Sequence, residues 1–184
     1  MRGMKVLALC GSLRSQSLCA ALLRATAELA PAGVELWIFA DHGRLPLFNP
    51  DLQPGDHDAV QSLRDAVAAA DAVIIASPEY AHGVTGTVKN TLDWLVDLAA
   101  FAGKPVAVFN PAPDAHHADD ALRETLRTMS ADLIPGACVR VPVIGSGVDP
   151  AAIASSAIHA AAIRSALAAI VAYVPFGSGA PTTR

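Results

Sequence analysis

The chain has few charged residues and few cysteines, and it lacks the common nucleotide-binding loops. Charged residues make up 16% of the chain, and the net charge is −4. Without clustered lysines and arginines, we expect no nucleic-acid binding. Three cysteines without a Cys-x-x-Cys pair favour reduced thiols and a cytoplasmic location. Neither Gly-x-x-x-x-Gly-Lys-Ser/Thr nor Gly-x-Gly-x-x-Gly occurs, which excludes a P-loop and the dinucleotide fingerprint.

Apolar residues are abundant, at 53%, but they do not predict a membrane protein. The most apolar stretch, Ala151 to Val174, carries His159 and Arg164 near its middle. An arginine near a bilayer centre costs roughly 2.5 kcal/mol or more, and alanine offsets little of that cost. We therefore interpret this stretch as a packed helix. The high apolar content instead suggests a surface buried between copies of the chain.

Short apolar runs alternate with helical segments five times along the chain. Strands are predicted at residues 5–9, 34–39, 72–76, 106–109 and 138–144, and helices at residues 18–29, 60–70, 88–100, 118–131 and 150–174. This alternation predicts an α/β fold with a five-stranded parallel sheet and helices on both faces. Ligands of such sheets bind at the carboxyl ends of the strands. The loops at 10–17, 77–87 and 110–117 should meet there.

The loop after the first strand, Cys10-Gly11-Ser12-Leu13-Arg14-Ser15-Gln16-Ser17, is rich in hydroxyl groups and leads into a helix. Backbone N–H groups, the helix dipole and the Arg14 guanidinium all favour a bound phosphate. A plain strand-to-helix turn with a serine cap would have a similar sequence. This loop alone therefore leaves both interpretations open.

Three further motifs follow along the chain: Leu-Pro-Leu-Phe-Asn at 45–49, Pro-Glu-Tyr at 78–80 and Gly-x-x-Lys-Asn-x-x-Asp-Trp at 86–94. Together with Gly-Ser-Leu-Arg-x-x-Ser at 11–17, they make residues 4 to 145 resemble the NADPH-dependent FMN reductase family. The resemblance implies a flavodoxin-like three-layer sandwich with strand order 2-1-3-4-5. We expect this domain to span residues 1–175, before a loose tail at 176–184. It also implies FMN, NADPH or NADH, a small-molecule acceptor such as a quinone or free flavin, and a homodimer or homotetramer.

The resemblance carries over to individual residues. It implies phosphate contacts from Ser12, Arg14 and Ser17. It implies that a second loop runs along the isoalloxazine ring, mainly through its backbone, at Pro78, Glu79, Tyr80, Ala81 and His82. For this second loop, the alternative is that Pro-Glu-Tyr only ends a strand.

The third loop departs from the family pattern, which is rich in glycine at this point. Residues 110–117 contain no glycine, two prolines that remove N–H donors, and the negative charge of Asp114. We therefore expect weak FMN binding. A diverged, non-enzymatic flavin- or nucleotide-binding protein remains the alternative function.

Three further features have two interpretations each. His116 and His117, with the acidic residues that follow, suggest either a metal site or a solvated loop, and the loop is favoured. Cys19, in a first helical turn, is either a reactive thiol or a small packed residue. The apolar residues of the segment 84–101, in particular Trp94, Leu95, Leu98 and Phe101, are expected in the core or at a subunit interface.

Overall fold

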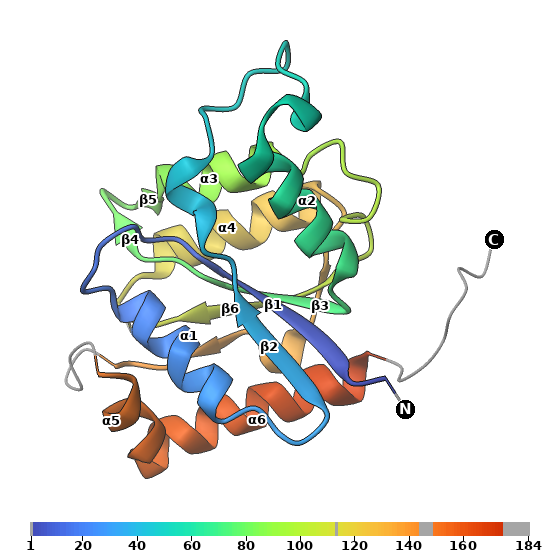
Figure 1. Ribbon diagram of the computed structural model, residues 1–184. Coiled ribbons are helices and arrows are strands. Elements are labelled where there is room, and N and C mark those ends of the chain that lie inside the picture. Colours follow the sequence, from blue (N-terminus) through green and yellow to red (C-terminus); the bar gives the residue numbers. More distant parts are fainter. Residues whose placement is uncertain (1, 113, 144–148, 175–184) are drawn as a thin grey trace.

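The computed structural model describes residues 2–112, 114–143 and 149–174 (Figure 1). A parallel sheet forms the middle layer. Its strands are β1 (Met4–Cys10), β2 (Val34–Ile38), β3 (Ala72–Ala76), β6 (Pro105–Asn110), β7 (Asp132–Leu133) and β8 (Val139–Arg140). The order is β2-β1-β3-β6-β7, and β8 also pairs with β6. This arrangement confirms the flavodoxin-like fold predicted from the sequence.

The fifth strand was predicted as one element at 138–144, and this prediction was wrong in detail. β7 and β8 share the place beside β6, with a 3-10 helix, η3 (Pro135–Ala137), between them. Proline starts the interruption, because it favours a helical turn and cannot donate to a sheet ladder. Residue 144 lies outside the described residues, as does the predicted tail at 176–184.

The helices cover both faces of the sheet. On one face lie α1 (Leu18–Glu28), α5 (Pro150–Ser155) and α6 (Ala157–Tyr173); on the other lie α2 (Asp58–Ala69), α3 (Gly86–Asp93) and α4 (His116–Thr128) (Figure 1). The predicted helix at 150–174 is broken at Ser156, whose side chain accepts the N–H of His159 and so starts α6. No helix within the described ranges is long and apolar enough to cross a membrane.

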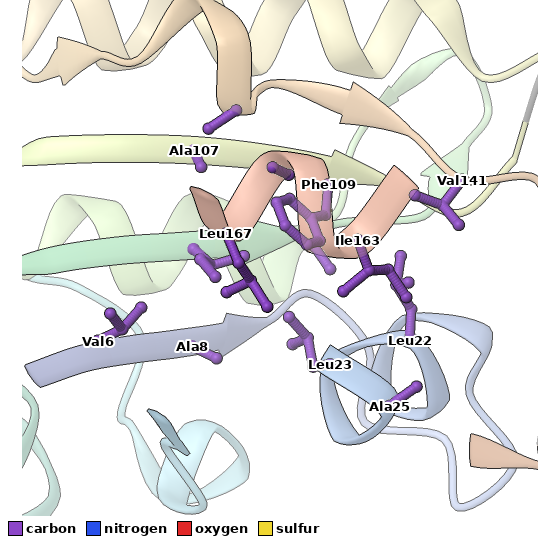
Figure 2. Packing of buried hydrophobic residues seen from close by; sticks show 14 of the residues in the cluster. Val6, Ala8, Leu22, Leu23, Ala25, Ala107, Phe109, Val141, Ile163 and Leu167 are labelled. Atoms are coloured by element: carbon purple, nitrogen blue, oxygen red, sulfur yellow. The ribbon is translucent and has the colours of Figure 1, made fainter. Parts of the chain in front are cut away.

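Each face of the sheet has its own hydrophobic core, because alternate residues of a strand point to opposite faces. Val6 and Ala8 of β1 belong to the cluster that contains Leu23 of α1 and Ile163 of α6 (Figure 2). Leu7 and Leu9 belong to the opposite cluster, which is completed by residues of α2, α3 and α4. The central strands are buried on both sides, which explains their continuous apolar runs.

Two segments predicted as loops contain short regular elements. Residues 41–58 include the 3-10 helices η1 (Asp41–Arg44) and η2 (Pro54–Asp56). Residues 79–84 form an antiparallel hairpin of β4 (Glu79–Tyr80) and β5 (Gly83–Val84). The predicted helix at 88–100 is shorter, since α3 ends at Asp93 and turns follow.

Candidate functional site

The loop after β1 and the segment after β3 are joined at the carboxyl edge of the sheet. The Gly11 N–H donates to the carbonyl of Ala76 at 2.7 Å. The Thr85 hydroxyl, which caps α3, donates to the carbonyl of Gly11 at 2.8 Å. A Cβ at position 11 would lie 2.6 Å from the Val88 side chain and 2.9 Å from Cα of Ser77. Only glycine permits this approach, so Gly11 brings the two predicted loops together.

In the first loop, Ser17 is the N-cap residue of α1. Its buried hydroxyl accepts the N–H of Ala20 at 3.3 Å. Ser12 accepts the N–H of Arg14 at 3.4 Å and is half-buried. The exposed Arg14 side chain makes no hydrogen bond or ion pair with any described residue. The loop thus offers one guanidinium and one hydroxyl beside the N-terminus of α1, whose first turn holds no acidic residue.

A buried histidine from η1 supports this loop, and sequence reasoning missed it. The Cys10 N–H donates to His42 Nε2 at 3.1 Å, so Nδ1 carries the proton and donates to the Thr91 hydroxyl at 3.0 Å. Burial lowers the pKa of His42 to about 4. β2 ends at Ile38, so it has no carbonyl beside the last residue of β1, Cys10. The imidazole of His42 accepts the Cys10 N–H in its place. Neutral His42 thereby ties the phosphate-type loop to α3.

The hairpin after β3 contains four of the five residues predicted to lie along the flavin ring, and the fifth, Pro78, directly precedes it. Its tight turn places Ala81 at φ 50° and His82 at φ 58°, both in the left-handed region. Such a turn matches the twist of a hairpin, but asparagine and glycine adopt it at lower cost than alanine. Pro78 is half-buried, and the Tyr80 side chain is 53% exposed. The hairpin therefore presents an accessible aromatic ring and its backbone at the sheet edge.

Two side chains of the hairpin contact α4. The Glu79 carboxylate accepts the N–H of Ala118 at 2.8 Å. The His82 ring stacks on the ring of His117, with centroids 4.3 Å apart and 23° between the planes. The side chains of Glu79 and His82, which were predicted to lie at the flavin, are thus engaged in contacts with α4. His116 and His117 had been predicted in a loop. In the structure they form part of the first turn of α4.

The third loop is held by Asn110 at the end of β6. Its side-chain amide donates to the carbonyl of Ala115 at 2.8 Å, and its oxygen accepts the N–H of Ala112 at 2.9 Å. Asp114 is exposed. Within the described residues no group of three His, Cys, Asp or Glu side chains is arranged to hold a metal ion.

The motifs at 45–49 and 86–94 meet through side-chain-to-backbone hydrogen bonds. The Asn90 amide and the Trp94 indole N–H both donate to the carbonyl of Pro46, at 2.9 Å each. The Phe48 N–H donates to Asn90 Oδ1 at 2.8 Å. Leu47, between these anchored residues, is 85% exposed. The two motifs therefore form one unit that displays an apolar side chain.

For the apolar residues of the segment 84–101 and for Cys19, the structure favours one of the two interpretations that the sequence left open. Trp94, Leu95 and Phe101 are buried in the core of the chain itself, so they cannot form a subunit contact. Cys19 is buried, and burial raises the pKa of its thiol. It is a packed residue beneath the first loop rather than a reactive thiolate.

The fold and the edge of the sheet define the class of the protein. A parallel sheet of this order, with a hydroxyl-rich loop between its first strand and helix, is the architecture of flavodoxin-like proteins. A model of the NADPH-dependent FMN reductase family matches residues 4–144, and the chain belongs to this family.

Similar proteins agree with this assignment. An NAD(P)H-dependent FMN reductase of Pseudomonas aeruginosa is 37% identical over 132 residues, which cover 66% of this chain and 69% of the relative. A quinone reductase of Escherichia coli K12 is 36% identical, over 57% of this chain and 58% of its own length. The matched segment thus spans little more than half of the quinone reductase. The flavoenzyme NAD(P)H:(acceptor) oxidoreductase FerB from Paracoccus denitrificans shares the fold, with a TM-score of 0.77 and 24% identity over 93% of this chain and 97% of that one.

Proposed function

We propose that the chain is an NAD(P)H-dependent FMN reductase that passes electrons through FMN to a small acceptor, either a quinone or free flavin. The observation that carries this proposal is the junction of the loop at 11–17 with the hairpin at 79–84, at the carboxyl edge of the sheet. In a chain of this family, that junction would put phosphate donors next to a backbone surface for a flat ring, which supports the proposal.

The available donors fit a phosphate ester. The Arg14 guanidinium has no described partner and can form a charge-assisted pair with the phosphate. The Ser12 hydroxyl lies in the same loop, which leads directly into the first turn of α1. We assign Ser17 to the phosphate site as well, where its hydroxyl orders the helix start that faces the anion.

The chain needs no side-chain acid or base for the redox step. FMN, when bound, supplies the chemistry by accepting a hydride from reduced nicotinamide and passing the electrons on. The segment 78–82 would support the ring through its backbone, and Gly11 and Thr85 hold that segment against the phosphate loop. Tyr80 is exposed enough to cover one side of the site.

The test is a flavin titration followed by reduction. FMN added to the purified protein should bind, and NADPH or NADH should then bleach the flavin absorbance. Quinones, azo dyes, chromate and free FMN are screened as acceptors. Absence of FMN binding up to about 100 μM would overturn the proposal. Binding without bleaching by either nicotinamide would favour a non-enzymatic flavin-binding protein.

We also propose a homodimer or homotetramer in the cytoplasm, with the contact at the rim of the site. Large apolar side chains are exposed on the first loop, on the segment 45–49 and on β4: Leu13, Leu47, Phe48 and Tyr80. Light scattering should show an oligomer that Leu47→Ser weakens. Ile158→Ser, at a residue 79% exposed on α6, is the matched control and should leave the oligomer intact. A monomeric wild-type protein would contradict this assembly.

A further inference from the structure

The helix α4 takes its N-terminal cap from a distant residue. Its own cap position, Ala115, has no side chain that can accept a hydrogen bond. The Glu79 carboxylate supplies the missing acceptor by binding the N–H of Ala118, the third residue of the helix, at 2.8 Å. This N–H is one that a serine or aspartate at the cap position would normally satisfy, and a negative charge is favourable at this end of a helix.

A second contact joins the same two elements. The His82 ring stacks on His117, whose ring in turn lies 4.2 Å from that of His116. His116 is itself oriented locally, since its Nδ1 lies 2.9 Å from the carbonyl oxygen of Asp114. The three imidazoles therefore connect the tip of the hairpin with the first turn of α4.

The hairpin depends on these contacts for its shape. Its strands are two residues long each, and a two-stranded hairpin is at best marginally stable alone. Its turn also holds two residues other than glycine in the left-handed region, Ala81 and His82, at a cost in free energy. The conformation must therefore be imposed from outside, and α4 contacts both strands.

We propose that Glu79 and His82 are positioning residues, which dock the hairpin on the first turn of α4 and so fix the backbone surface that receives the flavin ring. Their side chains act without touching the flavin. This assignment replaces any direct side-chain contact of these two residues with the cofactor and keeps the backbone contacts of the segment 78–82. The part that concerns the ring rests on the proposed function.

The first arm of the test uses the protein without flavin. In Glu79→Ala, amide exchange at His117 and Ala118 should accelerate about fivefold to tenfold, because the cap is lost. Adding Ala115→Ser supplies a local cap and should restore protection. Glu35→Ala, at an exposed glutamate on β2, is the control and should change nothing there. Unchanged exchange in Glu79→Ala would overturn the capping role.

The imidazole stack is tested by a double-mutant cycle on the flavin-free protein. His82→Asn keeps a residue that tolerates the left-handed region, and His117→Asn removes the facing ring. The effects of the two substitutions on the equilibrium constant of unfolding should be non-additive by about twofold or more. Strictly additive effects would show that the stack does not join hairpin and helix.

The second arm measures flavin binding. Glu79→Ala and His82→Asn should weaken FMN and riboflavin equally, by about tenfold, since only the ring surface is displaced. Glu79→Gln keeps an acceptor oxygen, so it should retain the flavin affinity and midpoint potential of the wild type. A shifted potential in Glu79→Gln with normal exchange in α4 would instead make Glu79 a flavin contact. If the wild-type protein binds no flavin, the proposed function fails, and the exchange and cycle experiments still decide the docking role.

Discussion

Replacing His42 by glutamine should remove a large part of the acid sensitivity of the fold. In the native protein the neutral ring accepts the Cys10 N–H, and burial holds the pKa at about 4, against 6.5 for an ordinary histidine. The unfolded chain therefore takes up a proton first as the pH falls. The stabilisation is fully present above about pH 6.5 and is lost as the pH falls towards 4, a difference of about 3 kcal/mol. That is a substantial fraction of the total stability of a domain.

The assay is urea unfolding of wild type and His42→Gln at several pH values. Between about pH 7 and about pH 4.5 the wild type should lose about 2 kcal/mol more than the variant. Glutamine can still accept from Cys10 but does not titrate. Carboxylates affect both proteins alike, so the difference isolates the imidazole.

Thr91→Val is the matched control. It removes the hydroxyl that binds His42 Nδ1 but keeps the titrating ring. This variant should be less stable at every pH and should retain a steep acid dependence. Equal pH dependence in wild type and His42→Gln would refute the reasoning, because the buried ring would then not govern acid stability.

Three other outcomes are expected. Arg14→Ala should weaken FMN binding about tenfold to a hundredfold and riboflavin binding much less, because riboflavin has no phosphate, whereas the control Arg164→Ala on α6 should affect neither flavin. Equal losses of affinity for both flavins would show that Arg14 does not bind the phosphate. Ala81→Asn should raise the stability by about 1 kcal/mol and the melting temperature by about 2–4 °C, because asparagine tolerates a φ of 50°; a lower melting temperature would contradict this. Trp94→Phe should lower the stability by about 1 kcal/mol and speed proteolysis near Pro46, because the indole N–H no longer binds the Pro46 carbonyl. An unchanged cleavage rate would show that the hydrogen bond from Asn90 alone holds this carbonyl.

The elements that sequence reasoning predicted well are those whose residues are buried by the sheet itself. The runs at 5–9, 72–76 and 106–109 are continuously apolar because helices cover both faces, and each became a central strand. The hairpin could not be predicted from local pattern. Its strands are two residues long, and its turn uses alanine and histidine where asparagine and glycine are the usual signal.

Side-chain roles at the site depended on contacts between distant segments. The family resemblance predicted that Glu79 lies at the site. It could not predict its hydrogen-bond partner, the Ala118 N–H, which is 39 residues further along the chain. Similarly, His42 lies 32 residues from the Cys10 N–H that it binds, in a segment without clear periodicity. The sequence shows no Ser, Thr, Asp or Asn at the cap position Ala115, but this could serve as a signal only once the start of α4 at His116 was known.

The division of the last sheet position into β7 and β8 has a consequence for self-association. A long exposed edge is a template on which another chain can add a strand, and this route leads to aggregation. Here each piece offers two ladder residues, and Pro135 and Pro142, on either side of β8, lack the N–H that an added strand would need. When two copies of the chain meet at this edge during refolding, the edge therefore offers no continuous row of backbone hydrogen-bonding groups for a new strand. The interrupted strand thus protects the described part of this flank from uncontrolled sheet extension.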